Sequence, residues 1–353
     1  MKILQIMAGA AQGGAETAFV DMCLALHDAG EQVEVITRAN DTRVPPLERA
    51  GINVHTAPFG AAIDVFTPWR IGRVISAFEP DIVQTWMARA AQKTPNWKTL
   101  HTPKRYLVVS RLGGYYKIKN FRSSDYFTTI TPDISRHLVD GGILAGRIRH
   151  INNFAETESG AAPVDRATLN TPEGAPVLLT LARLHESKAI DVVIRALAQM
   201  PGVYLWIAGD GPLKDELEKL AADMGVSDRT RFLGWRTDRS SLLQSADICV
   251  FASRVEPFGT VFAQAWAEKT PVIVSDADGP RQFCRDGEDS LMVPKNDAGA
   301  IVAAVEKILS DGGLRERVIE NGYKRYINEF TRQKTVSEYV GYYLEILKRE
   351  RMI

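Results

Sequence analysis

Residues 247–275 constrain the fold of this chain more than any other stretch. Residues 248–252 and 272–274 are short apolar runs rich in β-prone side chains, and residues 260–268 between them have the spacing of a short amphipathic helix. The stretch therefore predicts a strand, a loop, a helix and a second strand, with both strands buried. Such a unit is typical of α/β proteins, in which a helix connects two strands of one sheet.

The loop ahead of this helix carries a carboxylate, Glu256, followed by Pro257, Phe258, Gly259 and Thr260. The first amides of a helix have no partner inside it and add to the positive end of its dipole, so the amides near Gly259 suit a phosphate. Glycine at this position lets a ligand approach the backbone closely. Glu256 can accept hydrogen bonds from hydroxyls. Together these groups predict a site for a sugar attached to a nucleotide diphosphate.

This stretch resembles the donor-sugar signature of retaining glycosyltransferases of family 4, in which Glu-x-Phe-Gly is followed by a second glutamate eight residues after the first. The match covers Glu256, Phe258, Gly259 and residues 271–275, whereas the second glutamate is replaced by Gln264. The resemblance implies that Glu256 orients sugar hydroxyls. It also implies that Gln264 holds the ribose, and we expect it two helical turns below Glu256 on one helix face. The alternative is an ordinary buried turn whose glutamate caps a helix.

Length and composition set further bounds. The 353 residues suffice for two domains of ordinary size. Lysine plus arginine and aspartate plus glutamate both count 43, so no global charge favours nucleic acid or a membrane. Cys23, Cys249 and Cys284 lack metal-ligand or disulfide spacing, which fits a reducing cytoplasm. No run approaches the roughly twenty apolar residues that span a bilayer, and we expect residues 2–7 to form a buried strand rather than a signal sequence.

A glycine loop follows this first strand. Residues 9–16 read Gly-Ala-Ala-Gln-Gly-Gly-Ala-Glu, and a helix is expected over residues 17–29. The G-x-G-x-x-G spacing of dinucleotide sites is absent. Family 4 enzymes share Gly-Gly-Ala-Glu here, and the resemblance implies that Gly13 and Gly14 contact the donor diphosphate.

Two family landmarks of the first half lack their histidine. Gln84 and Trp86 take the places at which a family strand delivers histidine, and residues 110–113 replace Thr-x-His-Gly. In the family, this histidine helps to position the donor sugar. His101 lies nearby in the sequence and is a candidate substitute, with a structural or solvated role as the alternative.

Residues 82–124 contain no acid but nine lysines and arginines, with aromatic residues between them. These aromatic residues are Trp86, Trp97, Tyr106, Tyr115, Tyr116 and Phe121. We expect one positive, aromatic-edged surface, with Arg111, Tyr115, Tyr116 and Lys117 as acceptor contacts. An anionic glycan or glycolipid acceptor, an acidic membrane surface and single-stranded nucleic acid fit such a surface, nucleic acid least because no binding motif accompanies the charge. Solvated bases spread over several faces are the alternative.

In the second half, Arg183 and Lys188 bracket the turn between a strand over residues 177–181 and a helix over residues 190–199. Loops at such turns bind ligands in doubly wound sheets, and two cations can neutralise a diphosphate. The family has both cations at this spacing, although Ala182 replaces its glycine. Surface charges at the start of a helix are the alternative.

Three later stretches also follow the family. Residues 209–212, Gly-Asp-Gly-Pro, predict a turn that supports the fold rather than chemistry. Trp235 and Arg236 follow a strand whose loop lies against the nucleotide base in relatives, with a core position as the alternative for the tryptophan. Residues 278–282 take the place of a family loop near the donor, in which Gln282 replaces the usual acid.

The alternation of strands and helices predicts an α/β protein with two doubly wound, Rossmann-like domains. The resemblance implies that they face a cleft in the arrangement called the GT-B fold, with a C-terminal helix that crosses back to the first domain. We expect an acceptor-binding domain over residues 1–155, a linker over 156–174, a nucleotide-sugar-binding domain over 175–330 and the returning helix over 331–353.

The function implied by the resemblance is retaining transfer of a hexosyl group to a hydroxyl of a glycan or glycolipid, in lipopolysaccharide or other envelope polysaccharide synthesis. A UDP-sugar is the favoured donor and a GDP-sugar the next. Arg183, Lys188 and Glu256 are the expected catalytic residues, and we expect neither a metal nor a cofactor. The expected location is the cytoplasm, with peripheral contact at the inner membrane surface. A nucleotide-sugar-binding protein without transferase activity and a nucleotide-sugar epimerase of the same fold are the alternatives.

Overall fold

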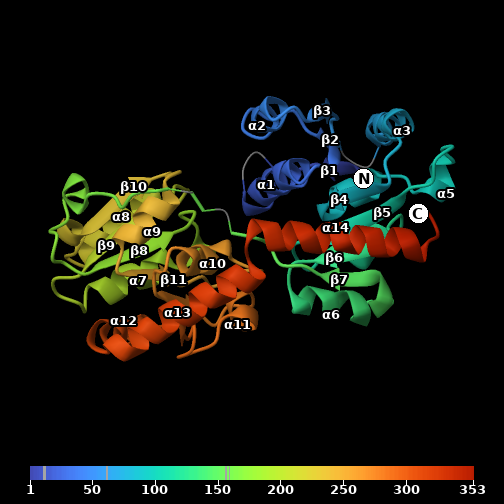
Figure 1. Cartoon of the computed structure of the whole chain (residues 1–353). Coiled ribbons are helices and arrows are strands. Elements are labelled where there is room, and N and C mark those ends of the chain that lie inside the picture. The colour runs from blue at the N-terminus through green and yellow to red at the C-terminus, as the bar shows by residue number, and fades with distance from the viewer. Residues whose placement is uncertain (11–12, 61–62, 156, 159) are drawn as a thin grey trace. The chain divides into compact units, whose positions relative to one another are not determined.

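The computed structural model describes the chain from Met1 to Ile353 apart from residues 11–12, 61–62, 156 and 159. The described residues form two compact units (Figure 1). Unit 1 combines Met1–Asn153 with Arg332–Ile353, and unit 2 comprises Phe154–Thr331. Each unit has its own parallel sheet and its own core.

The sheet of unit 1 has seven parallel strands in the order β3-β2-β1-β4-β5-β6-β7. The strands are β1 (Lys2–Met7), β2 (Gln32–Thr37), β3 (Asn53–Thr56), β4 (Ile82–Trp86), β5 (Leu107–Leu112), β6 (Tyr126–Thr129) and β7 (Ile148–His150). The strand order reverses direction between β1 and β4, and the carboxyl edge at such a reversal is the usual ligand-binding position of parallel sheets. The glycine loop follows β1 at this position.

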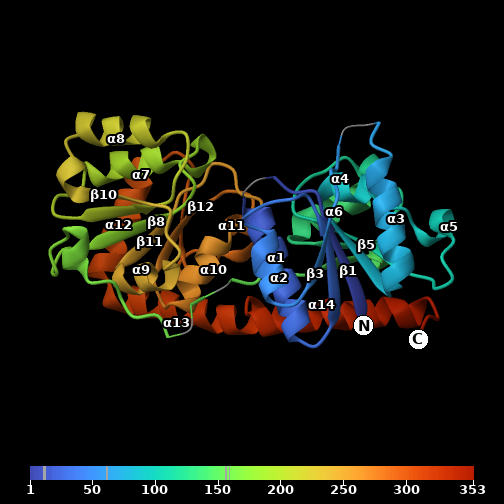
Figure 2. The ribbon, with the colours of Figure 1, turned by 90° about the horizontal axis from the view of Figure 1, so that it is seen from above.

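Helices connect the strands of unit 1 and cover both faces of the sheet (Figure 2). They are α1 (Gly14–Asp28), α2 (Val44–Arg49), α3 (Phe66–Phe78), α4 (Met87–Lys93), α5 (Trp97–Leu100), α6 (Pro132–Asp140) and α14 (Arg332–Arg349). Ile71 of α3 joins a core cluster with Leu4 and Val83 of the sheet. Because side chains alternate along a strand, Gln5 and Gln84 point to the opposite face.

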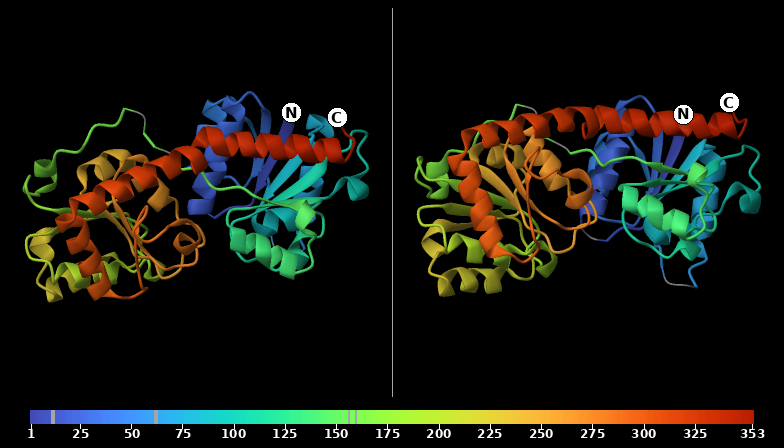
Figure 3. Two further views of the ribbon diagram at one scale, coloured as in Figure 1. Left: turned by 60° about the horizontal axis from the view of Figure 1, so that its bottom comes forward. Right: turned by 90° about the horizontal axis from the view of Figure 1, so that it is seen from below.

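This opposite face binds α14, which lies along the sheet of unit 1 (Figure 3). The hydroxyl of Tyr343 on α14 donates to Oε1 of Gln84, and Nε2 of Gln5 donates to the same oxygen over 2.9 Å. Nε1 of Trp86 donates to Oε1 of Gln5 over 2.7 Å. All four side chains are buried. Gln84 and Trp86, which take the places of the first of the two family landmarks, therefore belong to a buried network that fixes the C-terminal helix on unit 1.

The sheet of unit 2 has six parallel strands in the order β10-β9-β8-β11-β12-β13. The strands are β8 (Val177–Leu181), β9 (Tyr204–Ala208), β10 (Thr230–Gly234), β11 (Ile248–Phe251), β12 (Val272–Ser275) and β13 (Leu291–Val293). The strand order reverses between β8 and β11, so the loops that follow these neighbouring strands meet at the usual ligand-binding position of such sheets. These are the loops that carry Arg183 and Glu256.

The helices of unit 2 are α7 (Ile190–Leu197), α8 (Lys214–Asp223), α9 (Arg239–Ser245), α10 (Thr260–Ala267), α11 (Pro280–Phe283), α12 (Ala298–Ser310) and α13 (Gly312–Glu329). Helix α13 packs against α10. Its second half contains Gly322, where a Cβ atom would lie 2.4 Å from Cδ1 of Trp266. Tertiary contact with α10 therefore sustains a helix that local helix propensity alone does not predict.

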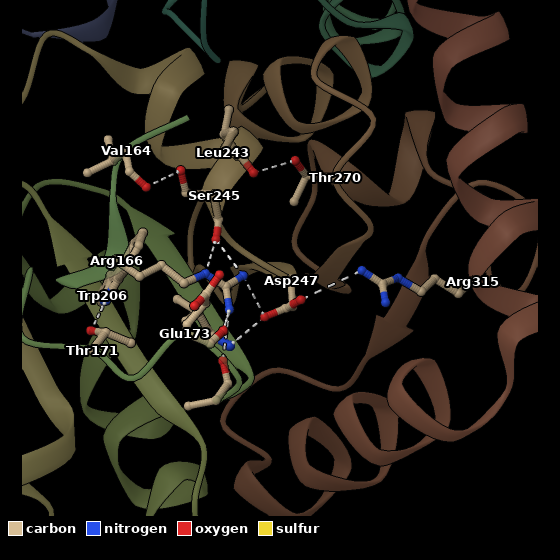
Figure 4. A network of polar contacts seen from close by, with 12 residues as sticks. Val164, Arg166, Thr171, Glu173, Trp206, Leu243, Ser245, Asp247, Thr270 and Arg315 are labelled. Carbon is tan, nitrogen blue, oxygen red and sulfur yellow. Dashed lines mark hydrogen bonds and ion pairs between the residues drawn. The ribbon is translucent and has the colours of Figure 1, made fainter. Parts of the chain in front are cut away.

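The segment expected to be a linker, residues 156–174, belongs to unit 2 in the parts that the structure describes. Figure 4 shows how Arg166 ties it to the sheet. This guanidinium donates to the carbonyl of Ser245 over 2.7 and 3.0 Å and pairs with Asp247 over 3.0 Å. Asp247 also accepts the amide of Val177 over 2.8 Å. One ion pair thus joins this segment to the starts of β8 and β11.

The prediction of an α/β fold with doubly wound parallel sheets is confirmed. The short elements α2, α4, α5, α9 and α11 were not predicted as separate helices. No helix in the described parts of the chain combines the length and apolar character needed to cross a bilayer.

Replacement of Arg166 should destabilise unit 2. Arg166→Met leaves the carbonyl of Ser245 and the carboxylate of Asp247 without their guanidinium, so we expect the free energy of unfolding to fall by about 1–3 kcal/mol. Urea denaturation followed by circular dichroism measures the change. Lys219→Met is the control, because its ion pair with Asp223 is exposed, at 75% and 58%, and should contribute less than about 0.5 kcal/mol. Equal losses in the two variants would contradict the assigned role of Arg166.

Candidate functional site

Two loops at the carboxyl edge of the sheet of unit 2 form the centre of the candidate site. One follows β8 and contains Arg183 and the short 3₁₀ turn Glu186–Lys188, and the other follows β11 and contains Glu256. The amides of Arg254 and Val255 donate to the carbonyl of Ser187 over 2.8 and 3.3 Å. Backbone hydrogen bonds therefore hold the two loops against each other.

Lys188 and Glu256 form an ion pair between these loops. Nζ of Lys188 donates to Oε2 of Glu256, and the two side chains are 23% and 12% exposed. The structure thus brings together two of the three residues predicted to be catalytic. Each charge is partly desolvated and neutralises the other while no ligand is bound.

Arg183, the third of these residues, is exposed, and its guanidinium has no hydrogen bond or ion pair among the described residues. The loop that carries Arg183 packs against the turn that follows β9. Gly209 and Gly211 pack so closely that a Cβ atom on them would lie 1.8 Å from the carbonyl oxygen of Ala182 and 2.4 Å from that of Leu184. The Gly-Asp-Gly turn therefore supports the loop that carries an accessible cation.

Arg254 was not predicted from the sequence, but it fixes the position of Lys188 and Glu256. Its guanidinium makes two hydrogen bonds to the carboxylate of Asp191, over 2.7 and 2.9 Å, and donates to the carbonyl of Glu186 over 2.7 Å. The hydrogen bonds from Arg254 to Asp191 raise the pKa of the arginine. A charged residue three positions after the end of a buried strand was the signal that could have identified it.

The start of α10 has the features of an anion-binding helix terminus. Gly259 precedes the helix with a φ of 83°, and as the N-cap residue it has no side chain that could cap the first amides. A Cβ atom at Gly259 would lie 2.4 Å from Cζ of Phe251, so only glycine fits this turn. Gly279 closes the loop from the other side, since its amide donates to the carbonyl of Glu256 over 2.8 Å.

An aromatic cluster anchors this loop from within. Phe258 is 3% exposed, and its ring lies 4.9 Å from that of Phe283 and 5.6 Å from that of Phe262, between ring centroids. Phe330 lies 6.2 Å from Phe258 and 5.8 Å from Trp266. Phe258 is thus a buried anchor that positions the backbone on either side of it, Glu256 and Gly259 included.

The spatial relation predicted between Glu256 and Gln264 is wrong. Glu256 lies in the loop before α10, not on the helix, so helical spacing does not relate the two side chains. Gln264 is in the second turn of α10 and is 4% exposed. Pro257 is exposed and Thr260 is half-buried at the helix start.

Trp235 and Arg236 follow β10, at the outer edge of the same sheet. Trp235 is 70% exposed, so the alternative of a core tryptophan is wrong. Strand β10 is two strands away from β8, which places its end about 10 Å from the Arg183 loop along the sheet edge. Arg236 makes two hydrogen bonds to Asp238, which raise the pKa of its guanidinium.

In unit 1, the predicted phosphate contacts Gly13 and Gly14 lie at the start of α1, and residues 11–12 of their loop are outside the described residues. The side chain of Glu16 accepts the amide of Ala10 over 2.7 Å. Arg43, which the sequence did not single out, is buried beside it and donates to the carbonyl of Ala10 over 3.1 Å. One acid and one arginine therefore hold the backbone of Ala10.

The predicted acceptor contacts differ from one another in exposure. Arg111 is only 3% exposed, with its guanidinium 4.0 Å above the ring of Trp86 and hydrogen-bonded to Asn153, and burial lowers its pKa. The prediction that Arg111 lies on a binding surface is therefore wrong. Tyr115 and Lys117 are exposed, whereas Tyr116 is half-buried and burial raises its pKa.

The prediction that residues 82–124 form one exposed, positive surface is likewise wrong for several of these residues. Trp86, Tyr106 and Phe121 belong to the core. Three of the bases are engaged in ion pairs, Lys93 with Asp64 over 4.0 Å, Lys104 with Asp81 over 2.7 Å and Arg105 with Glu350 over 2.6 Å. Much of this positive stretch thus contributes to folding.

Two further observations concern the candidate histidine and metal binding. His101 is exposed at the end of α5, and its Nδ1 lies 3.2 Å from the carbonyl oxygen of Thr99. Within the described part of the chain, no three His, Cys, Asp or Glu side chains lie close enough together to hold a metal ion.

Comparisons with known proteins agree with this geometry. Residues 12–159 match the model of Glycosyltransferase Family 4, and residues 162–325 match that of Glycosyl transferases group 1. The chain is 37% identical to the lipopolysaccharide core biosynthesis glycosyltransferase LpsE of Rhizobium meliloti (strain 1021), over 93% of this chain and 95% of the relative. It is 32% identical to LpsD of the same strain, over 96% and 97%.

Among solved structures, the Anabaena protein HepE in complex with UDP superposes with a TM-score of 0.84 at 21% identity, over 98% of this chain and 100% of that chain. A likeness at this identity shows the shared GT-B fold. Together with the match to both family models and to relatives over nearly their full lengths, it establishes that this chain belongs to the family 4 glycosyltransferases.

Proposed function

We propose that this chain transfers a sugar from a nucleotide-diphosphate sugar to a hydroxyl of a lipopolysaccharide core acceptor, with retention of configuration at the anomeric carbon. The observation that carries the proposal is the arrangement in unit 2 of an accessible Arg183, the Lys188–Glu256 ion pair and the uncapped start of α10. The names of the two R. meliloti relatives support the acceptor class.

The leaving diphosphate is the charge that such a site must stabilise. Arg183 is free to make two parallel hydrogen bonds to phosphate oxygens, and the amides at the start of α10 add a fixed positive dipole. Lys188 becomes a third positive group once a phosphate competes with Glu256 for its ammonium. These groups lower the barrier because negative charge grows on the diphosphate as the bond to the sugar breaks.

Glu256 is the proposed ligand for the sugar. With Lys188 drawn towards the diphosphate, its carboxylate accepts hydrogen bonds from sugar hydroxyls and fixes the anomeric carbon in front of the acceptor. The acceptor oxygen then forms its bond to this carbon as the bond to the phosphate oxygen breaks, and the acceptor proton passes to a phosphate oxygen of the leaving group. Retention and independence of metal ions belong to this proposal.

The proposed donor is a UDP-sugar, with a GDP-sugar next. The fold neighbour HepE has been solved with UDP, which supports this order. The exposed ring of Trp235 offers a stacking face for the base, while Arg236 is held by Asp238. Gln264 is the proposed ribose contact, and Gly13 and Gly14 of unit 1 are the proposed second set of amides for the diphosphate. The acceptor is proposed to use Tyr115, Tyr116 and Lys117.

The proposed location is the cytoplasm. Three free, buried cysteines in the structure agree with a reducing compartment. A nucleotide-sugar-binding protein without activity would bind UDP but release no product, and an epimerase would interconvert two donor sugars without an acceptor. Product analysis by mass spectrometry, with a UDP-sugar and truncated lipopolysaccharide, separates these three functions.

Replacement of Arg183 tests the donor site directly. Arg183→Ala removes a charge-assisted pair of hydrogen bonds, so UDP should bind about ten- to a hundredfold more weakly. Isothermal titration calorimetry in buffer with a chelator measures the dissociation constant and tests metal independence in the same experiment. Arg195→Ala is the control, since Arg195 is exposed on α7 of the same unit. An unchanged affinity in Arg183→Ala, or no UDP binding by the wild type, would reject the proposed donor site.

Replacement of Glu256 should separate donor binding from transfer. Glu256→Gln keeps the shape but removes the charge that pairs with Lys188, so UDP should bind as tightly as before or more tightly. Transfer from the UDP-sugar should fall about 100-fold, because the carboxylate no longer orients the sugar. Calorimetry and a radiolabelled transfer assay give the two numbers. A parallel loss of UDP affinity and transfer would mean that Glu256 only supports the loop.

The contact between Arg254 and Asp191 should behave as one unit. Arg254→Ala loosens the turn that holds Lys188, so both UDP affinity and turnover should fall about tenfold. Asp191→Ala should give a similar loss, and the double variant should lose no more than the worse single variant, because the same contact is removed in all three. Additive losses in this double-mutant cycle would show that the two side chains act independently.

A further inference from the structure

An apolar patch on unit 1 has no role in the proposed transfer chemistry. Four large side chains within seven residues are exposed, and we call them the 63–69 patch: Ile63 at 93%, Val65 at 79%, Phe66 at 52% and Trp69 at 52%. Outside this stretch, no window of seven residues in the described chain exposes more than two large apolar side chains. Clusters of this kind on a polar protein mark a surface that contacts another phase or molecule.

The patch is presented by an ordered turn. The carboxylate of Asp64 accepts the amides of Gly60 over 2.7 Å and Thr67 over 2.9 Å, which fixes the chain at the start of α3. The rings of Phe66 and Trp69 lie 5.4 Å apart on the outer side of this helix. Because Thr67 and Ile71 face the core, the apolar side chains of the patch point outward from an ordered segment.

Basic side chains lie beside the patch on the same helix. Helix α3 carries Arg70 and Arg73 and no acid, and the next acids along the chain are Glu79 and Asp81. Both acids lie beyond the far end of α3, and Asp81 is paired with Lys104. Arg73 is exposed two turns along α3 from the start of the helix, with its guanidinium 5.2 Å above the ring of Trp69.

A second helix brings more bases to the patch. Lys93 of α4 donates to the carbonyl of Asp64 over 2.8 Å and lies 4.0 Å from its carboxylate. Arg89 donates to the carbonyl of Gly60 over 2.9 Å. A hydrogen bond from Thr67 lowers the pKa of Asp64 to about 2, so this acid stays charged, and Lys93 offsets its charge. Figure 2 shows the start of α3 and helix α4 together at one end of unit 1.

The chemistry of this surface fits an anionic bilayer. Aromatic and branched apolar side chains that project from a turn can insert at the boundary between headgroups and acyl chains, while arginines beside them contact lipid phosphates. Four partly exposed side chains offer much less than the roughly 800 Å² per partner of a stable protein interface. Positive charge beside an apolar centre is complementary to a negatively charged membrane surface.

We propose that the 63–69 patch, with Arg70 and Arg73, attaches unit 1 to the surface of a bilayer that contains anionic phospholipids. This inference rests on the proposed function in one respect, because a membrane-attached enzyme meets a lipid-linked acceptor where that acceptor resides. The attachment uses neither the donor site of unit 2 nor the predicted acceptor contacts of unit 1.

The first test compares binding to vesicles. The full chain should sediment with vesicles of phosphatidylcholine containing phosphatidylglycerol, less with pure phosphatidylcholine, and less at high salt. Val65→Ser/Phe66→Ser should weaken binding about tenfold or more, because it removes two inserted side chains. Val65 is the N-cap position of α3, where serine is favoured, so the helix should still form. Val139→Ser/Leu144→Ser, which changes two other exposed side chains of unit 1, is the matched control.

A second test reports on the position of the patch. The three native cysteines are buried, and burial raises the pKa of each thiol, so a cysteine introduced at residue 65 can be labelled selectively. An environment-sensitive fluorophore on Val65→Cys should shift to the blue when anionic vesicles are added. The same fluorophore on Leu144→Cys should not shift.

Three outcomes would overturn the proposal: no binding of the wild type to anionic vesicles, an equal loss in the control variant, or a dimer that Val65→Ser/Phe66→Ser converts to a monomer in light scattering. Calorimetry with UDP on the same variants keeps the two proposals apart. Vesicle binding without UDP binding would reject the donor site alone, and UDP binding without vesicle binding would reject the membrane attachment alone.

Discussion

The constraint on which the rest of this structure depends is the burial of two parallel sheets on both faces. Every strand pair in both units is parallel, and the inner strands are almost wholly buried. Such a sheet can expose polar backbone only at its edges, where loops leave the strands. In unit 2 the reversal of strand order between β8 and β11 brings two of these loops together, and all the strongest candidates for donor chemistry lie on them. The position of the site thus follows from topology before any side chain is considered.

The same constraint explains why the second unit was the more predictable from sequence. A strand, a loop with Glu256 and a helix that begins at Thr260 follow from local patterns that the fold preserves almost residue for residue. Arg254 could not be found in this way, because its importance comes from Asp191, 63 residues earlier in the chain. Gly209 and Gly211 were assigned to a turn, but the reason that glycine is needed there is contact with the neighbouring loop at Ala182 and Leu184. Local sequence predicts elements, whereas contacts between distant segments decide the positions of side chains.

Charge patterns in the first unit were harder to interpret for a related reason. A run of bases and aromatic residues does not reveal which side chains face the core, and the stretch from residue 82 to 124 alternates between strand, helix and turn. Arg111 and Trp86 lie on neighbouring strands β5 and β4 in direct register, so they stack on each other inside the unit. The exposed aromatic pair of Phe66 and Trp69 lies upstream of that run, which itself exposes Tyr115. The register of the parallel strands therefore decides which arginines are buried and which are exposed, and the sequence alone does not reveal this register.

The ion pair of Lys188 with Glu256 links the geometry of the site to its proposed chemistry. Two partly buried charges stabilise a fold little, because their attraction is offset by the loss of hydration. Removing one partner, in contrast, leaves the other as an uncompensated charge in a half-buried loop. A diphosphate that draws Lys188 away would leave the carboxylate of Glu256 as such an uncompensated charge. Sugar hydroxyls prevent this if they donate hydrogen bonds to the carboxylate at the same time. A nucleotide without a sugar satisfies only the lysine, whereas a nucleotide sugar satisfies both residues. On the proposed mechanism, the Lys188–Glu256 pair therefore favours binding of the nucleotide sugar over binding of the nucleotide alone. The nucleotide alone binds less well because it leaves Glu256 without a hydrogen-bonding partner.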